Sequence, residues 1–201
     1  MADETGKIIT DCTETGCIAK RKNIILAVSG GIAAYKACDL ITLLKKAGHD
    51  VRVIMTKNAE RFIPAMTLAT LSKHPVMRNM WQEKNGTVDH IDIASWADMF
   101  VVYPATANII GKFANGIADD LLSTVFLALP PKVTRVIFPA MNTYMYTNPI
   151  VENNMFKLAN SCTVTHTRKG LLACGTKGLG CLLRPKEAMD ILNEIVMGRK
   201  V

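Results

Sequence analysis

The sequence predicts a three-layer α/β protein, in which helices cover both faces of a doubly wound parallel sheet. Short apolar runs of strand length alternate along the chain with segments that carry apolar residues at helical spacing, and this alternation is typical of parallel sheets. The length of 201 residues suits one buried core, and no repeat or linker divides the chain. We therefore expect one domain over residues 23–201, preceded by a flexible polar tail at residues 1–22.

The first predicted unit consists of a strand, a helix and a second strand. The apolar run 23–29 has the composition of a buried parallel strand and ends in a pair of glycines. Residues 32–47 carry apolar side chains at helical spacing, and Gly48 follows as a typical helix stop. Residues 50–55 form the next strand. These elements predict a βαβ unit whose first turn is rich in glycine.

The same alternation continues to the end of the chain. Strands are expected over residues 98–103, 133–138 and 162–166, and helices over about 106–115, 119–129, 148–160 and 186–196. The last helix is amphipathic and is started by Pro185, a residue favoured in the first turn. Right-handed connections between parallel strands then place helices on both faces of the sheet.

Composition excludes several classes of protein. No apolar run is long enough to cross a bilayer, and the N-terminus lacks an apolar signal core, so we expect a cytoplasmic protein with no membrane partner. The cysteines then predict free thiols, and the lack of a Cys-x-x-Cys pair or a histidine cluster predicts no metal site. The net charge of +7 arises from dispersed basic residues, which favours a phosphorylated small molecule over nucleic acid.

Small and hydroxyl residues follow the predicted strands. In parallel sheets, ligands bind beyond the carboxyl ends of the strands, where backbone N–H groups and helix N-termini favour anions. Small side chains also let a large planar ligand approach the backbone closely. The residues at these ends are Ser29, Gly30, Gly31, Thr56, Pro104, Ala105, Thr106, Ala107, Asn108, Pro139, Ala140, Met141 and Asn142. The sequence therefore predicts a ligand site at this edge of the sheet.

The ligand expected at this edge is a mononucleotide. The first turn lacks the Gly-x-Gly-x-x-Gly spacing of dinucleotide-binding proteins, and the second strand ends in Thr56 without an acidic residue for a ribose. Thr106 and Asn108 can hydrogen-bond a phosphate at the start of a helix. FMN is the candidate that fits these features.

Six motifs in a fixed order extend this interpretation. They are GGIAAYK (30–36), HIDIASWAD (90–98), PATAN (104–108), ADDLLST (118–124), PAMN (139–142) and LACG (172–175). Over about residues 23–196 the chain resembles the phosphopantothenoylcysteine decarboxylases, which are homo-oligomeric flavin-containing cysteine decarboxylases. This resemblance implies a Rossmann-like, flavodoxin-like fold, an FMN cofactor, and a homotrimer or dodecamer with the flavin near the subunit interface.

The resemblance also implies roles for individual residues. His90 matches the active-site base, Asn142 the asparagine that holds the substrate, and Cys174 the proton-donating cysteine. The implied flavin contacts are Gly30, Gly31, Ile32, Thr56, Thr106, Ala107, Asn108 and Ala140. These roles connect the edge of the sheet to a cysteine that lies late in the chain.

The segment around Cys174 departs from the family at one place. Some members carry an arginine after the last glycine of this segment, where this chain has Cys181. Lys177 or Arg184 would then supply the missing charge in the grip on the substrate. The glycines of the segment are Gly170, Gly175, Gly178 and Gly180. They predict a mobile loop that closes over the substrate.

The reaction implied by the resemblance is the decarboxylation of 4'-phosphopantothenoylcysteine to 4'-phosphopantetheine in coenzyme A biosynthesis. A transient oxidation of the CH₂–SH group to a thioaldehyde provides an electron sink beside the departing CO₂. The resulting enethiol is then reduced to the thiol, so there is no net redox change. In this scheme His90 assists the oxidation, Asn142 holds the carboxylate, and Cys174 delivers the final proton.

Other functions stay open at this point. A peptidyl-cysteine decarboxylase would use the same His90 and Asn142 on the C-terminus of a peptide. A non-catalytic phosphatase regulator shares the fold, although such relatives usually carry long acidic extensions that this chain lacks. A flavin prenyltransferase also shares the fold, but the combination of His90 with the PAMN and LACG motifs argues against it.

Several other polar and aromatic residues receive no catalytic role. Among them are His49, His74, His166, Trp81 and Trp96, of which the tryptophans are expected to pack in the core or at an interface. Asp119 and Asp120 are expected to begin a helix, where acidic side chains favour the dipole and adjacent side chains diverge.

Overall fold

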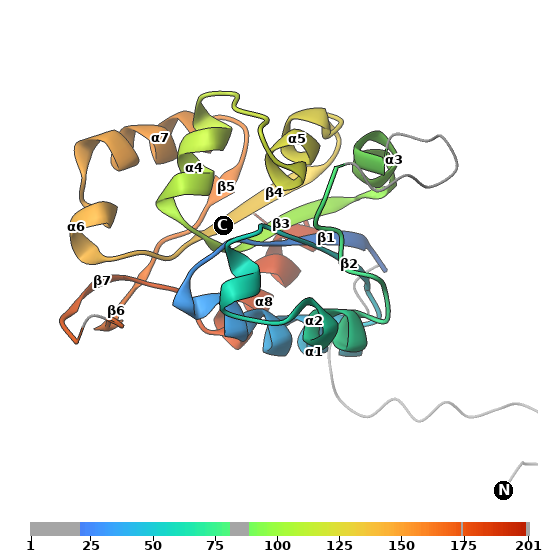
Figure 1. Cartoon of the computed structure of the whole chain (residues 1–201), viewed down its shortest axis with the longest axis horizontal. Helices are drawn as coiled ribbons and strands as arrows, with labels where there is room; N and C mark the ends of the chain where they lie inside the picture. The colour runs from blue at the N-terminus through green and yellow to red at the C-terminus, as the bar shows by residue number, and fades with distance from the viewer. Residues whose placement is uncertain (1–20, 81–88, 174, 200–201) are drawn as a thin grey trace, which may run out of the picture.

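The computed structural model describes residues 21–80, 89–173 and 175–199. The main sheet is built from β1 (Asn23–Val28), β2 (Asp50–Met55), β3 (Met99–Ala105), β4 (Thr134–Pro139) and β5 (Thr163–Val164). All neighbouring strands pair in parallel, in the order β2-β1-β3-β4-β5. This is the order of flavodoxin-like sheets, and it confirms the predicted doubly wound α/β class (Figure 1).

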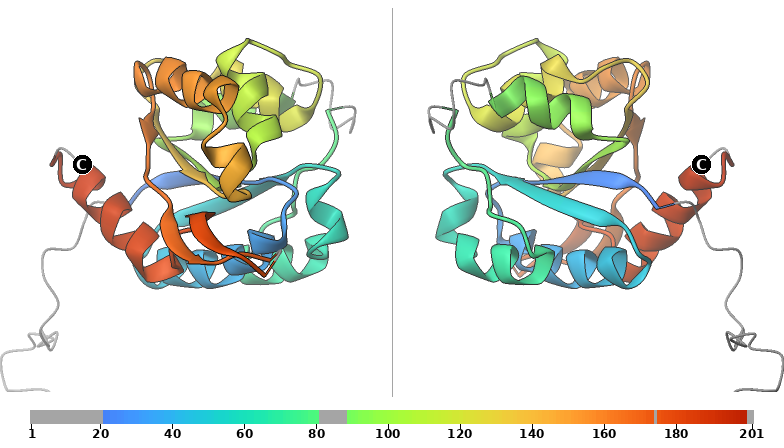
Figure 2. Two further views of the ribbon diagram at one scale, coloured as in Figure 1. Left: turned by 90° about the vertical axis from the view of Figure 1, so that its left-hand side faces the viewer. Right: turned by 90° about the vertical axis from the view of Figure 1, so that its right-hand side faces the viewer.

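Helices cover both faces of the sheet and complete the three layers (Figures 1 and 2). One face packs against α1 (Ala37–Lys46), α2 (Ala65–Ser72) and α8 (Pro185–Val196), and the other against α3 (Asp89–Trp96), α4 (Ala107–Ala114), α5 (Leu121–Ala128) and α7 (Pro149–Ala159). Alternate side chains of β1 divide between the two cores, with Ile24 and Leu26 in the first and Ile25 and Ala27 in the second. A strand buried on both faces therefore has an unbroken apolar sequence.

The first βαβ unit forms as predicted, with one difference in its helix. A 3-10 turn, η1 (Ile32–Lys36), precedes α1, whereas the sequence predicted one α-helix from residue 32. Gly31 has an extended backbone before this turn, and its carbonyl accepts the N–H of Ala34 at 2.9 Å. The bond between residues three apart is the pattern of a 3-10 helix, which is tighter than an α-helix. It leaves the side chain of Tyr35 exposed.

The other predicted strands and helices are present close to their expected bounds. The sequence did not predict α2, the short helix α6 (Thr143–Tyr146) or the 3-10 turn η2 (Ala59–Arg61). Most of the predicted tail and Trp81 lie outside the described residues.

The glycine-rich segment near the end of the chain forms a β-hairpin where the sequence predicted a loop. β6 (Arg168–Leu171) pairs antiparallel with β7 (Lys177–Cys181), outside the main sheet. A Cβ atom on Gly178 would collide with the hydroxyl of Thr143, and one on Gly180 with the carbonyl of Met141. Gly180 also has a φ of +111°. These two glycines let the hairpin pack closely against the loop after β4, which is a different reason for glycine than mobility.

Candidate functional site

A cavity of about 950 Å³ lies beyond the carboxyl ends of β1, β3 and β4. The turns after β1 and β2, the start of α4, the loop after β4 and the hairpin all contribute to its walls. The predicted site residues that line it are Gly30, Gly31, Ile32, Thr56, Thr106, Ala107, Asn108, Ala140 and Asn142. The structure thus brings together every predicted flavin contact and one of the predicted catalytic residues.

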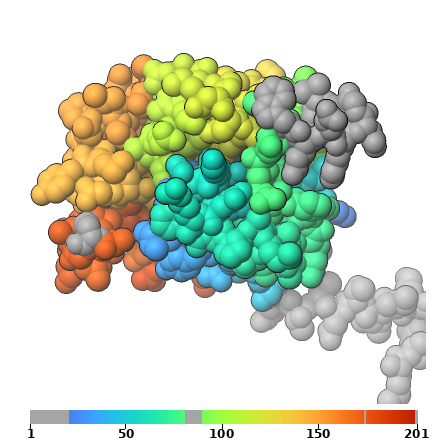
Figure 3. All heavy atoms as spheres, viewed as in Figure 1, coloured from blue at the N-terminus to red at the C-terminus, as the bar shows by residue number. Residues whose placement is uncertain are grey.

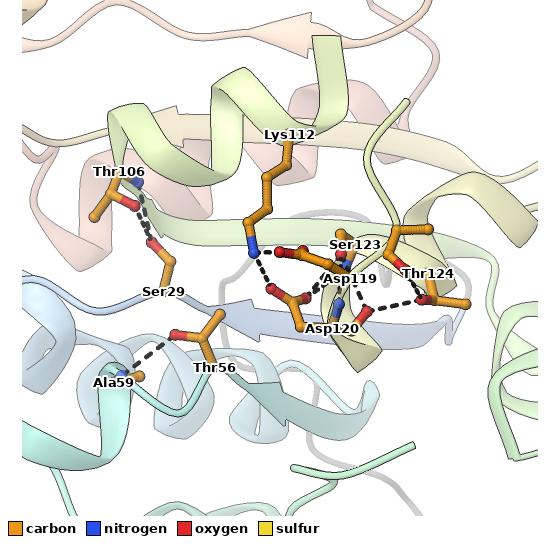
Figure 4. A network of polar contacts seen from close by, with 10 residues as sticks. Ser29, Thr56, Ala59, Thr106, Lys112, Asp119, Asp120, Ser123 and Thr124 are labelled. Carbon is orange, nitrogen blue, oxygen red and sulfur yellow. Dashed lines mark hydrogen bonds and ion pairs between the residues drawn. The ribbon is translucent and has the colours of Figure 1, made fainter. Parts of the chain in front are cut away.

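Ser29 joins β1 to β3 beneath the cavity (Figure 4). Its hydroxyl donates to the carbonyl of Pro104 at 2.7 Å and accepts the backbone N–H of Thr106 at 3.0 Å. The two strands are neighbours in the sheet, but the chain continues from β1 to α1 on one face and from β3 to α4 on the other. This is the topological switch point, where open α/β sheets bind their ligands.

The first turn of α4 faces the cavity. Thr106 is the N-cap residue, and its side chain does not cap the helix. Ala107 and Asn108 follow it, and both line the cavity. Because the first backbone N–H groups of a helix have no intrahelical acceptor, and because the dipole is positive at this end, such a turn suits a phosphate group.

The turns after β1 and β2 pack tightly against each other. A Cβ on Gly30 would lie 2.5 Å from Asn58 Cβ and 2.7 Å from its carbonyl carbon, so glycine is required there. A Cβ on Gly31 would lie 3.5 Å from the methyl group of Thr106, which is an ordinary contact. The hydroxyl of Thr56 accepts the N–H of Ala59 at 3.3 Å (Figure 4). The resulting wall is formed by backbone and small side chains, and a planar ring can approach it closely.

Asn142 lies between β4 and α6, and it is held against the hairpin. Its amide oxygen accepts the N–H of Tyr144 at 2.8 Å and so caps α6. The next residue, Thr143, donates its hydroxyl to the carbonyl of Leu179 in β7 at 2.7 Å. Residues 171–173, at the end of β6 and just after it, line the same cavity. In the space-filling view, the hairpin lies directly against α6 (Figure 3).

A network centred on Lys112 lies where α4 approaches the start of α5 (Figure 4). Its Nζ atom lies 2.6 Å from Asp119 Oδ1 and 2.6 Å from Asp120 Oδ2. Asp120 is also the N-cap of α5, where it accepts the N–H of Ser123 at 2.8 Å. The prediction that the two carboxylates diverge is wrong. Asp119 and Asp120 both precede α5, and the backbone at Asp120 is extended. The two side chains therefore reach the same ammonium group of Lys112.

Burial and hydrogen bonding act in opposite directions on this network. Burial alone would raise the pKa of Asp120, but hydrogen bonds from Lys112 and Ser123 outweigh it and lower the pKa. Burial alone would lower the pKa of Lys112, but its hydrogen bonds to Asp119 and Asp120 raise the pKa instead. The lysine and the capping aspartate are therefore both charged at neutral pH.

The other two predicted catalytic residues are placed differently. Cys174 lies outside the described residues, although Leu172 and Ala173 before it line the cavity. His90 lies in the first turn of α3, but it does not line the cavity. In Figure 1, α3 and the hairpin lie at opposite ends of the molecule. One chain therefore does not bring His90 to Asn142.

Sequence analysis missed the lysines that line the cavity. They are Lys36 at the end of η1, Lys57 after β2 and Lys112 of α4. The position of Lys36 within the GGIAAYK motif was a signal that could have identified it. Among the residues discussed for the grip on the substrate, Cys181 lines the cavity, whereas Lys177 and Arg184 do not.

The remaining histidines lie away from the cavity. The Nδ1 atom of His49 lies 3.2 Å from the backbone nitrogen of Lys22, and His74 Nε2 lies 2.8 Å from the carboxylate of Asp50. Within the described part of the chain, no cluster of three or more acidic, histidine or cysteine side chains could hold a metal ion. No helix there has the length and apolar character needed to cross a membrane.

The sheet order and the cavity at the switch point define an α/β protein with a ligand site at the carboxyl edge of its sheet. Residues 13–198 match the Flavoprotein family, and the chain belongs to this family. The match agrees with the motifs at the strand ends, which now lie together in space.

Two relatives are similar over most of this chain. It is 47% identical over 173 residues to the coenzyme A biosynthesis bifunctional protein of Bacillus subtilis strain 168, which covers 85% of this chain and 42% of the relative. It is 46% identical over 163 residues to a probable phosphopantothenoylcysteine decarboxylase of Streptococcus mutans, which covers 80% of this chain and 91% of the relative. The chain spans less than half the length of the bifunctional protein.

Two solved structures share the fold over nearly their whole length. A phosphopantothenoylcysteine decarboxylase, solved as a cysteine-to-serine mutant with pantothenoylaminoethenethiol, has a TM-score of 0.79 and 29% identity, over 88% of this chain and 98% of that chain. The FMN-binding protein AtHal3 has a TM-score of 0.77 and 29% identity, over 90% of this chain and 100% of that chain. These similarities confirm the resemblance drawn from the motifs.

Proposed function

We propose that the chain catalyses the FMN-dependent decarboxylation of 4'-phosphopantothenoylcysteine to 4'-phosphopantetheine, a step of coenzyme A biosynthesis. The observation that carries this proposal is one cavity that joins the flavin-motif residues to Asn142 and to the hairpin. The names of the bacterial relatives refer to the same pathway and reaction. The decarboxylase solved with pantothenoylaminoethenethiol supports an enethiol as the product of the first stage.

FMN fits the residues at the edge of the sheet. The first turn of α4 suits its phosphate, and the glycine turn after β1 leaves room for its ring system. When bound, FMN supplies a two-electron acceptor that oxidises the CH₂–SH group and later returns the electrons, which gives no net redox change. The similarity to the FMN-binding protein AtHal3 supports this choice of cofactor.

In this proposal Asn142 holds the substrate carboxylate. The amide oxygen of Asn142 accepts the N–H of Tyr144, and an amide nitrogen is a donor of the kind that a carboxylate requires. The bonds from Thr143 and Met141 to the hairpin fix the position of Asn142 before substrate binds. A preorganised donor loses little conformational entropy when the substrate arrives.

Cys174 delivers the proton that completes the saturated thiol. The N–H of Leu172, which precedes it, donates to the carbonyl of Thr176 at 2.8 Å. Gly175, with a φ of +84°, donates its N–H to the carbonyl of Leu172 at 2.9 Å. Leu172 and Ala173 line the cavity, which supports a role for the thiol in the same site as Asn142.

His90 would reach this site from a second copy of the chain. Within one chain, α3 and the hairpin lie at opposite ends (Figure 1). Tyr144 on α6 and Ile150 and Phe156 on α7 expose 83%, 72% and 73% of their surface. Exposed apolar side chains of this kind favour self-association, which supports a homo-oligomer, and the resemblance implies a homotrimer or dodecamer. The free thiols of Cys38 and Cys162 support a reducing, cytoplasmic setting.

The proposal is tested by mixing the FMN-loaded protein with 4'-phosphopantothenoylcysteine without oxygen and following CO₂ and thiol products by mass spectrometry. Wild type should release CO₂ and form 4'-phosphopantetheine. Cys174→Ser should release CO₂ but accumulate a product two hydrogens lighter, because the final protonation is blocked. A folded, FMN-loaded wild type that releases no CO₂ would refute the proposed reaction.

The same assay separates the alternatives. A peptide ending in cysteine replaces the phosphorylated substrate, and CO₂ from the peptide alone would establish a peptidyl-cysteine decarboxylase. A phosphatase regulator would turn over neither substrate and would inhibit a phosphatase in a direct binding assay.

A further inference from the structure

The cavity has a basic wall, formed where η1 meets the hairpin. Lys36, the last residue of η1, lines the cavity together with Cys181 of β7. Arg168 of β6 does not line the cavity itself, but it stands opposite Cys181 in the register of the hairpin. Figures 1 and 2 show η1 beside the hairpin, so residues far apart in the sequence meet at this wall.

Positive charge is in excess at this wall. The side chain of Arg168 lies 3.5 Å from the carboxylate of Glu187, which also accepts the backbone N–H of Arg184 at 2.7 Å. The charges of Arg168, Arg184 and Glu187 all act on the ammonium group of Lys36. The group therefore contains three cations and one carboxylate, which leaves two positive charges without a counter-charge among these residues.

The environment of Lys36 disfavours an isolated ammonium group. Burial lowers the pKa of Lys36, and the neighbouring charge of Arg168 lowers it further, while Cys181 and Glu187 offset only part of this effect. A dianion bound at the wall would remove the repulsion between the two cations. A guanidinium can bind a phosphate through two hydrogen bonds, and an ammonium adds a mobile point charge.

We propose that Lys36 and Arg168 bind the terminal phosphate of the substrate arm, a phosphate monoester, at the end of the cavity formed by η1 and the hairpin. This inference rests on the proposed function. The phosphate of FMN has its own site at the first turn of α4, whereas the basic wall adjoins Asn142 through the hairpin. The wall therefore selects the phosphorylated substrate over the same arm without phosphate.

The test compares kcat/KM for 4'-phosphopantothenoylcysteine and for pantothenoylcysteine, which lacks the phosphate. Lys36→Gln and Arg168→Gln should each lose about 10- to 100-fold on the phosphorylated substrate, the range of one charged hydrogen bond. Both variants should lose less than about threefold on pantothenoylcysteine, since the contacts to the reacting end are intact. Lys169→Gln is the matched control, because this neighbouring residue is exposed and belongs neither to the cavity lining nor to the charges that act on Lys36.

Equal losses on both substrates, or the same loss in Lys169→Gln, would overturn the inference. Flavin binding provides a second arm: the ratio of the dissociation constants for riboflavin and FMN should be unchanged in Lys36→Gln. A selective loss of FMN affinity would instead assign the wall to the phosphate of the cofactor.

Calorimetric titration of the FMN-loaded protein with 4'-phosphopantothenate and with pantothenate measures the site without turnover. Wild type should prefer the phosphorylated ligand, and Lys36→Gln should lose that preference. If wild type releases no CO₂ but shows this preference, the proposed reaction fails while the phosphate site stands. If CO₂ is released but no preference is seen, the inference fails alone.

Discussion

The two sides of the cavity are built in different ways. The side at the ends of β1 and β3 consists of small residues that follow buried parallel strands, and the bonds of Ser29 tie it together. The opposite side is formed by α6 and the hairpin, which lie outside the main sheet and are held to it through backbone contacts at glycine. The first side is thus rigid because it is part of the core. The second side is held in position by a few close contacts.

This difference suggests a division of labour. The proposed cofactor side must hold a planar ring and a phosphate in one geometry through the whole reaction, and a closely packed core provides that. The proposed substrate side must admit and release an extended arm. A small peripheral sheet opens at lower cost in free energy than a core strand, because fewer buried contacts are broken.

Gly30→Ala should have the largest effect and should act on the cofactor side. The added Cβ would lie within 2.9 Å of three atoms of Asn58, two of them in the backbone. We expect the free energy of unfolding to fall by about 3 kcal/mol, with loss of FMN binding, as measured by denaturant titration and flavin fluorescence. Gly111→Ala is the matched control and should retain both, since this residue of α4 does not line the cavity and its Cβ would meet only an ordinary contact with Asn154.

Gly180→Ala should damage the substrate side and spare the other. Its φ of +111° and the carbonyl of Met141 both oppose a side chain, so the hairpin should loosen at a cost of about 2 kcal/mol. Decarboxylation should fall more than tenfold while FMN affinity is retained. Gly198→Ala, with a φ of +73° and no atom within 4 Å, should cost about 1 kcal/mol and leave turnover intact. Loss of FMN from Gly180→Ala would contradict the division.

Asp120→Ala tests the network that links α4 to α5. Removing the cap and its ion pair should lower the free energy of unfolding by about 1.5 kcal/mol, whereas Asp119→Ala, at a more exposed carboxylate, should cost less than about 0.5 kcal/mol. Because folding lowers the pKa of Asp120, its contribution is present above about pH 4 and is lost as the pH falls through the lower folded value. Denaturation curves of wild type and Asp120→Ala should therefore converge in acid.

Ser29→Ala should have the smallest effect. It removes the hydroxyl that bridges Pro104 and Thr106, and we expect a loss of about 1 kcal/mol with a measurable weakening of FMN binding. Thr42→Val removes a hydroxyl bond within α1, far from the cavity, and should leave FMN affinity unchanged. Equal effects of the two variants on FMN would argue against a role of Ser29 at the switch point.

The cofactor side could be predicted from the sequence and the substrate side only in part. Buried parallel strands are apolar runs, and the residues after them must meet at one edge, so the strand pattern alone was enough to assign Gly30, Thr106 and Ala140 to the site. The hairpin could not be predicted, because its strands are short and rich in glycine and charge. Their pairing depends on contacts with Thr143 and Met141, which sequence periodicity does not record.

The same limit explains why the sequence did not predict that Asp119 and Asp120 bind one lysine. Their sequence indicated a helix start, and Asp120 does cap α5. Their convergence on Lys112 depends on the packing of α4 beside α5, a tertiary contact. The sequence motif identified His90, whereas the distance of His90 from the hairpin follows only from the packing of α3 in the fold.

The distance between α3 and the hairpin predicts how two mutant alleles would behave when they are expressed together (Figure 1). If each site draws His90 from one copy and Cys174 from another, two inactive alleles, one altered at each residue, would complement each other when expressed together. Some interfaces in the mixed assemblies would contain both native residues. A strain with both alleles should then grow partially, while neither allele alone should support growth. This result would follow from the separation of α3 and the hairpin within one chain.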